Sequence, residues 1–335
     1  MVAWLGVIFM ALIVAKELKK YFVKRTFHGK EVVKAVDNVS FKISKGETFC
    51  LIGESGSGKT TLGKLVIGLL KPDYGEVFFE NVKVNRLKSR EAIKFRLLVQ
   101  YIPQHPDSAL DPRWKIYDSI AEPLRIHKLV DDKREEKQRV LEVIKTVGLK
   151  EEHMERYPHE LSGGELQRAI IARAIILNPK FIFADEPTSM LDISTQAQIL
   201  RLLLNIKENF STTYMLTTHD IEVAAYISDT VAVMYKGRLV EICGKDELLK
   251  NPLHPYTQQL VTSIKTFKHT SLKIPTNKPL TKIFSKRFKT DNTVKLNSAC
   301  PFYDKCPYKN SPCEKFSPQL IEVEYNHLVA CHFYS

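Results

Sequence analysis

The stretch Gly53-Glu-Ser-Gly-Ser-Gly-Lys-Thr60 decides the fold, because it fits the pattern G-x-x-x-x-G-K-[S/T] of a phosphate-binding loop. A predicted strand, Thr48 to Ile52, precedes it, and a predicted helix runs from Lys59 to Leu70. Glycines in such a loop let backbone N–H groups approach phosphates at the amino terminus of the helix, where the helix dipole favours anions. We therefore expect a nucleotide site at this turn.

Two residues of the loop have separate expected tasks. Lys59 should reach the β- and γ-phosphates, and the Thr60 hydroxyl should ligate Mg²⁺. An ordinary glycine-rich turn is the alternative, and the motifs further along the chain disfavour it. The residues expected to contact the nucleotide are Gly53, Glu54, Ser55, Gly56, Ser57, Gly58, Lys59, Thr60 and Thr61.

Two adjacent carboxylates, Asp185 and Glu186, follow the apolar strand predicted from Phe181 to Ala184. Neighbouring residues at a strand end point in different directions, so the two can divide the work. Asp185 is expected in the Mg²⁺ shell, and Glu186 is expected to orient or deprotonate the attacking water. An isolated Asp-Glu pair is as often a solvated turn, but its position downstream of the phosphate-binding loop favours the catalytic interpretation.

A second helix start carries the pattern of an anion site. Leu161-Ser-Gly-Gly-Glu-Leu-Gln-Arg168 places small residues and free N–H groups where a strongly helical run, Glu165 to Leu177, begins. With the loop, the acid pair, Gln104 and the segment Thr217-Thr-His-Asp220, these motifs resemble those of the ABC ATPase family and stand in the family's order. The resemblance covers roughly residues 11 to 250.

The resemblance implies roles that the residues alone do not. Ser162, Gly163, Gly164 and Glu165 would contact the nucleotide held by a partner chain, and Asp192 would lie in a dimer-facing loop. Gln104 would be both a Mg²⁺ ligand and a catalytic residue, and His219 would hold the γ-phosphate. Phe22, with Tyr21 as the alternative, would stack on adenine. Two departures from the family pattern are Glu165, where glutamine is commoner, and His105, where relatives often have aspartate.

Short strands alternate with amphipathic helices, which predicts an α/β fold of the P-loop NTPase type with a mostly parallel core sheet. Strand-like alternation in residues 33–43 and 75–79 predicts an added antiparallel sheet, and residues 105–165 predict a helical insertion. The first strand is expected from Ala11 to Phe22. The expected organisation is an apolar extension (1–9, with Met10 as an alternative start), an ATPase domain (10–250) and a carboxy-terminal extension (251–335).

The net charge of +12 in 335 residues is concentrated in one place. Residues 265–295 hold nine basic residues against one acidic residue, which argues against a broad nucleic-acid face and favours a linker. Lipid headgroups or an acidic loop of a partner are the alternative ligands for this stretch. The uncharged run Val2 to Ala15 is shorter than the ~20 residues that span a bilayer.

The tail narrows the resemblance. Asn251-Pro-Leu-His-Pro-Tyr-Thr-Gln-Gln-Leu260 resembles the His-Pro-Tyr segment of oligopeptide and dipeptide importer ATPases, and residues 108–113 and 120–127 resemble their second ATPase type. This resemblance implies a second ATPase subunit as a heterodimer partner, two integral-membrane permeases and an extracytoplasmic substrate-binding protein. It places the chain peripherally on the cytoplasmic face of the membrane, with no nucleic-acid partner.

Three alternatives stay open or are disfavoured at this point. The same type of transporter can carry nickel or sugars instead of peptides. A soluble ABC ATPase acting on ribosomes or DNA usually has two ATPase units or long coiled-coil insertions, and neither is found. A non-catalytic regulatory subunit is disfavoured because every catalytic group is present.

Four of the six cysteines cluster near the end of the chain, at Cys300, Cys306, Cys313 and Cys331. A structural zinc site usually has a tighter Cys-x₂₋₄-Cys pair, and disulfides are uncommon in cytosolic proteins. Relatives with this tail carry a four-iron four-sulfur cluster, so the resemblance implies one here. Zinc, free thiols and disulfides remain the alternatives, and Cys50 and Cys243 are expected to be packing residues.

Overall fold

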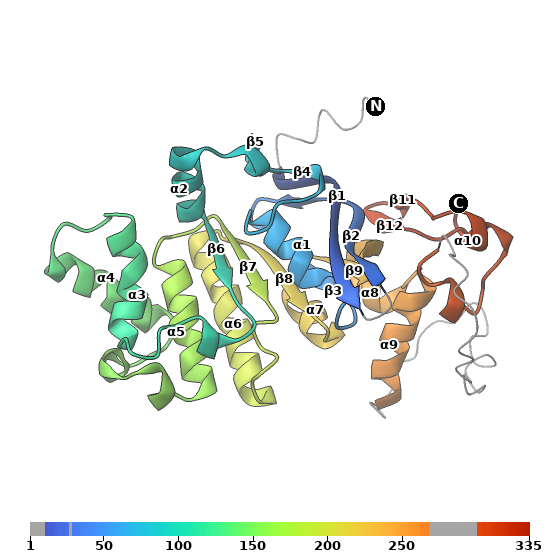
Figure 1. Ribbon diagram of the computed structural model, residues 1–335. Coiled ribbons are helices and arrows are strands. Elements are labelled where there is room, and N and C mark those ends of the chain that lie inside the picture. The colour runs from blue at the N-terminus through green and yellow to red at the C-terminus, as the bar shows by residue number, and fades with distance from the viewer. Residues whose placement is uncertain (1–10, 27–28, 268–299) are drawn as a thin grey trace. The chain divides into compact units, whose positions relative to one another are not determined.

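The computed structural model describes residues 11–26, 29–267 and 300–335 (Figure 1). Its contacts divide the chain into unit 1, which ends at Leu239, and unit 2, which begins at Val240. The expected apolar extension, with Met10, and nearly all of the basic stretch 265–295 lie outside the described residues. Within the described ranges, none of the helices combines the length and the apolar character needed to cross a bilayer.

Unit 1 has the predicted α/β architecture. Its parallel core sheet has the strand order β9-β3-β8-β7-β6, and the phosphate-binding loop follows the central strand β3. The strands of this sheet are β3 (Thr48–Ile52), β6 (Val99–Ile102), β7 (Phe181–Asp185), β8 (Thr213–Thr218) and β9 (Thr230–Tyr235). Strands β3, β7 and β8 are buried along their whole length, which fits the mostly apolar sequences of β3 and β7, whereas β8 also contains three threonines.

The added antiparallel sheet is confirmed, with the order β2-β1-β4-β5. Its strands are β1 (Ala11–Thr26), β2 (Gly29–Ser44), β4 (Tyr74–Phe79) and β5 (Val82–Lys83). Strand β1 is longer than the expected Ala11 to Phe22, because it continues to pair with β2 in a hairpin whose partners run as far as Thr26 and Gly29.

Helices pack on the core sheet and form the predicted insertion. Helix α1 contacts β7 and β8, α7 contacts β3, and α5 contacts β6, while α3, α4 and α5 pack against one another. The helices of unit 1 are α1 (Lys59–Val66), α2 (Ser89–Leu98), α3 (Ile116–Ile126), α4 (Lys133–Thr146), α5 (Gly163–Ile175), α6 (Ile193–Phe210) and α7 (Ile221–Ile227), with 3-10 turns at Val84–Arg86, Pro106–Ser108, Glu151–Glu155 and Pro158–Glu160.

Helix α1 is shorter than predicted, and it packs in direct contact with β7, the strand that ends at Asp185. It ends at Val66 rather than Leu70, since Gly68 has φ +70° and the chain there closes with a Leu69 N–H to Lys64 O bond. A Cβ on Gly63 would lie 2.0 Å from the Phe183 ring, so only glycine allows α1 to approach β7 this closely.

Unit 2 contains a small antiparallel sheet, in the order β10-β12-β11, and the helices of the tail. Its elements are β10 (Arg238–Gly244), whose first two residues belong to unit 1, α8 (Lys245–Lys250), α9 (Pro255–Phe267), a 3-10 turn (Tyr303–Lys305), α10 (Ser311–Lys315), β11 (Ile321–Glu324) and β12 (His327–Val329). Cys243 is fully buried in β10, as Cys50 is in β3 of unit 1, which fits packing roles for both.

Candidate nucleotide site and cysteine pocket

The phosphate-binding loop of unit 1 is closed around Lys59. Its ammonium group donates to the carbonyls of Gly53 at 2.8 Å and Glu54 at 3.1 Å, and it lies 3.8 Å from a carboxylate oxygen of Glu186. Burial lowers the pKa of Lys59, although the nearby carboxylates of Glu186 and Asp185 oppose this shift. The Lys59 side chain therefore lies inside a loop of the type that binds phosphates.

Glycine is required where the loop enters α1. Gly58 has φ +108°, and a Cβ there would lie 2.0 Å from the Ala35 carbonyl oxygen. This close approach brings β2 against the loop. Because the N-cap residue of α1 is Gly58, no side chain caps the first N–H groups of the helix. Such free N–H groups favour an anionic ligand.

Asp185 and Thr60 bring oxygen donors together beside the loop. The Thr60 hydroxyl donates to Asp185 Oδ1 at 2.9 Å, and the Thr217 hydroxyl donates to the same oxygen at 2.6 Å. Asp185 is only 1% exposed. Hard divalent cations such as Mg²⁺ prefer this kind of oxygen donor set, so the residues present fit the ion.

Glu186 has an uncommon backbone conformation and contacts three polar side chains, those of Thr217, Gln104 and His219. Its φ is +45°, and its N–H donates to both the carbonyl oxygen and the hydroxyl of Thr217, at 3.1 and 3.0 Å. Its Oε2 lies 3.2 Å from Gln104 Nε2 and 3.2 Å from His219 Nδ1. Strained backbone of this kind persists when neighbours fix it, and it concentrates at functional sites.

One cleft of unit 1 brings most of these groups to a common surface. It is lined by Val32, Val33, Lys34, Ala35, Ser55, Gly56, Gly58, Lys59, Thr60, Thr61, Gln104, Glu186, His219 and Lys236. Gly53, Glu54 and Ser57 do not line this cleft, and the carbonyls of the first two accept hydrogen bonds from Lys59.

Two aromatic residues compete for the expected adenine contact. Tyr21 uses its hydroxyl to donate to Asp37 at 2.6 Å, and burial and this carboxylate raise the Tyr21 pKa to about 12. Phe22 is 42% exposed and pairs across the strands with Val33, which lines the cleft, although Phe22 itself does not. The Tyr21 hydroxyl is thus engaged by Asp37, while the exposed Phe22 ring has the Lys20 ammonium group 5.7 Å from its centre.

The expected dimer-facing residues lie at the starts of two other helices. Ser162 caps α5, where Glu165 accepts from the Ser162 N–H at 2.9 Å and from its hydroxyl at 2.8 Å. Asp192 caps α6 by accepting from the N–H groups of Ser194 and Thr195, and hydrogen bonds from these residues lower the Asp192 pKa. Neither Ser162 nor Asp192 lines the cleft described above.

Several residues at the site were not anticipated as site residues. Thr217 links the two acidic residues, and the Tyr101 hydroxyl lies 3.5 Å from Asp185 Oδ2. Lys34 and Lys236 add positive charge to the cleft. Thr217 is the first residue of the segment Thr217 to Asp220, so that motif contained the signal, whereas nothing in the sequence marks Tyr101 or Lys236.

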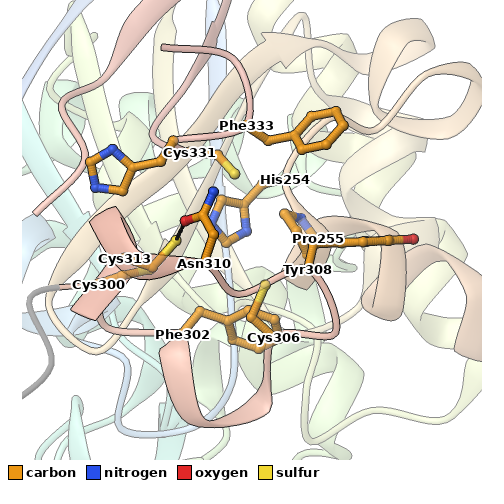
Figure 2. Close-up of a pocket in the computed structure, with 11 residues that line it drawn as sticks. His254, Pro255, Cys300, Phe302, Cys306, Tyr308, Asn310, Cys313, Cys331 and Phe333 are labelled. Carbon is orange, nitrogen blue, oxygen red and sulfur yellow. Dashed lines mark hydrogen bonds between the residues drawn. The ribbon is translucent and has the colours of Figure 1, made fainter.

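The four clustered cysteines of unit 2 line one pocket (Figure 2). All four are free thiols, and burial raises the pKa of Cys300, Cys306 and Cys331, in the last case to about 11. The Cys313 thiol donates to Asn310 Oδ1 at 2.8 Å. The pocket is completed by His254, Pro255, Phe302, Tyr308, Asn310, His332 and Phe333.

The spacing of the sulfur atoms distinguishes between metal groups. A tetrahedral zinc site with bonds of ~2.3 Å puts its sulfurs ~3.8 Å apart. Among the described residues, the groups of three or more potential ligands whose donor atoms all lie within 4.8 Å of one another include no set from these four cysteines. A four-iron cluster binds each thiolate to a different iron and needs a wider arrangement, so the donor set fits the cluster better than a single zinc ion.

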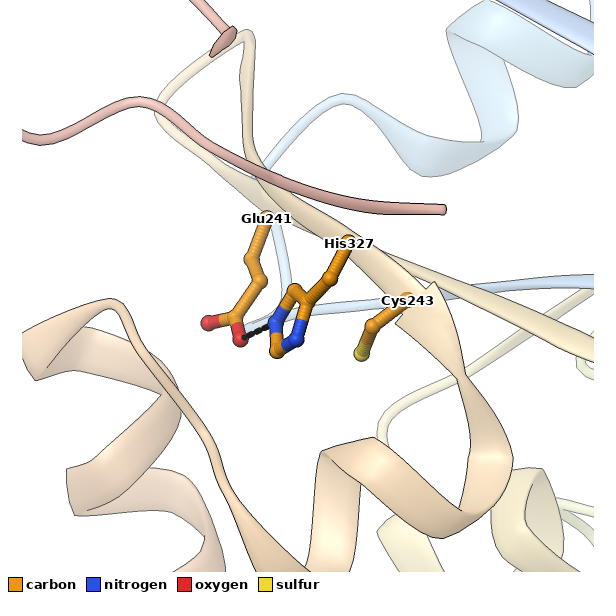
Figure 3. A group of neighbouring side chains, drawn as sticks. All are labelled: Glu241, Cys243 and His327. Atoms are coloured by element: carbon orange, nitrogen blue, oxygen red, sulfur yellow. Dashed lines mark hydrogen bonds and ion pairs between the residues drawn. The ribbon is translucent and has the colours of Figure 1, made fainter. Parts of the chain in front are cut away.

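A buried Glu241–His327 pair lies in the same unit, with Cys243 beside it (Figure 3). Glu241 accepts hydrogen bonds from the N–H groups of Leu253 and His254, both at 2.8 Å, and His327 Nε2 lies 2.7 Å from its Oε1. These three bonds occupy the carboxylate, so a metal ion would have to break them. We therefore interpret Glu241 as the residue that fixes the start of α9 to β10 and β12.

The parallel sheet, the phosphate-binding loop and the acid pair define an ABC-type transport ATPase, an ATP hydrolase. The family described as ABC transporter matches residues 36–189, and the oligopeptide/dipeptide transporter C-terminal region matches residues 240–313. The chain belongs to the oligopeptide/dipeptide importer ATPase family.

Individual relatives support this assignment. The chain is 40% identical over 325 residues to the oligopeptide transport ATP-binding protein AppF of Bacillus subtilis, covering 96% of each chain. It is 49% identical over 254 residues to OppF of the same organism, covering 76% of this chain and 82% of the relative. A solved dimer of the ATP-binding cassette MJ0796 bound to ADP and Pi has a TM-score of 0.63 and 32% identity, over 70% of this chain and 98% of that one.

Proposed function

We propose that this chain couples ATP binding and hydrolysis to the import of oligopeptides or dipeptides through separate permease subunits on the cytoplasmic face of the membrane. The observation that supports this most is the likeness to AppF over 96% of both chains, which includes the tail as well as the ATPase unit. A binding protein outside the membrane would deliver the cargo, as membership of the peptide importer family implies.

The residues of the cleft would have separate roles in ATP hydrolysis. Loop N–H groups and Lys59 would hold the phosphates, and Thr60 and Asp185, joined by Gln104, would hold Mg²⁺, which neutralises charge developing on the phosphate oxygens. Glu186 lies where it can orient or deprotonate a water that attacks the γ-phosphate. His219, 3.2 Å from Glu186, would contact the same phosphate group.

The nucleotide would be shared between two chains. Phe22 would stack on adenine within one chain, while the start of α5 in the opposite chain (Ser162, Gly163, Gly164 and Glu165) would approach the γ-phosphate. The loop before Asp192 would face the dimer partner. The exposed helix starts and their absence from the cleft of their own chain support an arrangement in which the partner's cleft uses them.

The catalytic role of Glu186 is tested by Glu186→Gln, which keeps the shape of the side chain and removes its basicity. ATP hydrolysis should fall by about 10²–10⁴-fold, the usual contribution of a positioned base, while ATP binding is retained. Glu208→Gln, an exposed change at the end of α6, is the matched control and should keep full turnover. Unchanged hydrolysis by Glu186→Gln would refute the role.

Partners and cargo are tested together in the native cell. The Glu186→Gln chain is purified from solubilised membranes with ATP present, and we expect two multispanning permeases and a second ATPase to copurify. Uptake of a radiolabelled oligopeptide should require the wild-type chain and should be competed by unlabelled peptide. Competition by nickel or a sugar, or recovery of ribosomes or DNA, would reject the peptide assignment.

We also propose that Cys300, Cys306, Cys313 and Cys331 hold a four-iron four-sulfur cluster, which would supply a one-electron redox centre. The common pocket of the four thiols supports this assignment, and no three of their sulfur atoms lie within 4.8 Å of one another, as they would around a single zinc ion. Chain purified without oxygen should contain iron and acid-labile sulfide and absorb visible light, and Cys306→Ala should lose them. Cys243→Ala, which alters a cysteine outside the pocket, should retain them, and colourless protein containing zinc would contradict the proposal.

A further inference from the structure

The first residue of the His-Pro-Tyr segment, His254, faces the cysteine pocket. Its ring is 3% exposed and lines the same cavity as the four cysteines. Figure 2 draws this ring and the sulfur atoms of Cys306 and Cys331 turned toward that cavity. The segment that marks this family of tails is therefore part of the wall around the sulfur atoms.

The hydrogen-bonding of the ring defines its tautomer. His254 Nδ1 accepts the backbone N–H of Tyr256 at 3.0 Å, so Nδ1 carries no proton and the neutral ring has its proton on Nε2. Within the part of the chain that the structure describes, no group accepts a hydrogen bond from Nε2. This nitrogen is not one of the fully buried atoms that lack a partner, and His254 lines the cavity, so its N–H is open to an acceptor bound there.

Neighbouring groups hold the ring in this orientation. The His254 backbone N–H donates to Glu241, which is itself paired with His327 (Figure 3). The Phe302 ring packs edge-on against the imidazole, with 5.8 Å between ring centres. The donor thus points to the cavity from a fixed backbone and a packed ring, rather than from a mobile surface residue.

We propose that His254 donates its Nε2–H to a sulfur atom of the cluster held by the four cysteines and thereby raises the reduction potential of that cluster. The inference rests on the proposed iron–sulfur cofactor. A hydrogen bond to sulfur draws off electron density and stabilises the form that has gained an electron, so its removal makes reduction harder. His254 is a positioning and tuning residue here, and the cysteines remain the ligands.

The second histidine of the pocket provides a matched control. His332 also lines the cavity, but its Nε2 lies 2.9 Å from the Phe316 carbonyl oxygen and its Nδ1 lies 3.4 Å from the Ser335 hydroxyl. Both ring nitrogens of His332 therefore have partners outside the cluster. His332→Gln should leave the potential of the cluster unchanged.

The test is a redox titration of full-length protein purified without oxygen, after iron and sulfide have been measured in each sample. One electron from the chemical titrant enters the cluster in each case. His254→Phe, which keeps a planar ring and removes the donor, should lower the equilibrium constant for reduction about tenfold, equivalent to about 59 mV for one electron. His254→Gln, which restores an N–H donor, should return toward the wild-type potential.

A second readout does not depend on the His254→Phe variant. Wild-type chain labelled with ¹⁵N-histidine and reduced chemically should show a weak nitrogen coupling to the cluster in pulsed electron paramagnetic resonance. The coupling should persist in His332→Gln and vanish in His254→Gln, and it decides the matter even if His254→Phe fails to assemble the cluster. Equal potentials in wild type and His254→Phe at equal iron content would overturn the inference alone, whereas iron-free wild-type protein would overturn the proposed cofactor with it.

Discussion

Glu186 combines its proposed catalytic role with a backbone conformation that side chains rarely adopt. Its φ of +45° is held by two hydrogen bonds from its N–H to Thr217. The strand end therefore turns the carboxylate toward Gln104 and His219, while Asp185 stays buried beneath. Adjacent acids thus reach different environments, and this supports the separate roles proposed for them.

Gly58 provides a test of the loop geometry. Gly58→Ala should abolish ATP binding, because its Cβ would meet the Ala35 carbonyl at 2.0 Å where φ is +108°. Gly46→Ala is the control, since Gly46 also has a positive φ, +76°, but its Cβ would meet nothing within 4 Å. We expect Gly46→Ala to cost about 1–2 kcal/mol of stability and to keep ATP affinity, as measured with a fluorescent nucleotide. Normal affinity in Gly58→Ala would contradict this account of the loop.

A buried network at Asp37 predicts a dependence of stability on pH. Burial would raise the Asp37 pKa, but hydrogen bonds from Tyr21 and Arg238 and the positive charge of Arg238 outweigh it and hold the pKa below its usual range. Since the folded-state pKa is depressed, the stabilisation is fully present above the unfolded pKa of ~3.9 and is lost as the pH falls through the folded value.

The corresponding variant is Asp37→Asn. It should lower the free energy of unfolding of unit 1 by about 2 kcal/mol at neutral pH, because the charged acceptor for Arg238 and Tyr21 is lost. The difference from wild type should shrink as the pH falls below ~3.9, where the wild-type carboxylate also becomes protonated. Denaturant titrations across this range measure it, and a difference that is independent of pH would show that the charge of Asp37 is not responsible.

The motif residues were accessible to sequence reasoning because phosphate chemistry demands glycines, a lysine and a hydroxyl at fixed spacing. The relations among distant residues were not accessible. Nothing in the local sequence places Tyr101 beside Asp185, which the parallel pairing of β6 with β7 does. The same holds for Lys34, in the antiparallel strand β2, and Lys236, directly after β9, which line one cleft. Their roles depend on tertiary structure rather than on pattern.

At the scale of the element, the start of α5 explains an unusual residue. Glu165, which stands where glutamine is commoner in the family, forms a capping box with Ser162. Its other carboxylate oxygen lies 3.2 Å from His153 Nε2. A capping box accepts either glutamate or glutamine at this position, which explains why the departure is compatible with the helix start.

Substitutions at Glu165 separate capping from charge. Glu165→Ala should destabilise unit 1 by about 1 kcal/mol, because the Ser162 N–H loses its partner. Glu165→Gln should cost markedly less, since the amide oxygen can accept the same bond. Thermal unfolding of the two variants beside wild type makes the comparison, and equal losses would assign the effect to the negative charge instead.

Element types were predicted well, and element ends less well. Strand β3 matches the prediction residue for residue, because its apolar run has sharp polar borders. Helix α1 and strand β1 differ from their predicted ends, at Gly68 and Thr26, since backbone conformation and cross-strand pairing set those limits. The antiparallel order β2-β1-β4-β5 required contacts between segments more than 30 residues apart.

At the scale of the whole molecule, the proposed shared nucleotide makes assembly depend on ATP. We expect the Glu186→Gln chain alone to stay monomeric in size-exclusion chromatography with ATP, and to form a stable complex when the second ATPase subunit is added. The physical reason is that, in the proposed arrangement, each nucleotide would bridge a phosphate-binding loop and the helix start of the opposite chain. ATP-dependent dimers of this chain by itself would instead support a homodimer.

The contact between Gly63 and Phe183 has a mechanical consequence. With no room for even a methyl group between α1 and β7, the helix that follows the phosphate-binding loop cannot slide over the strand that carries the acidic pair. Interiors packed this densely are stiff and transmit strain rather than absorb it. A displacement at the phosphates should therefore move α1 and β7 together as one rigid body. Any deformation has to occur in the segments that surround them.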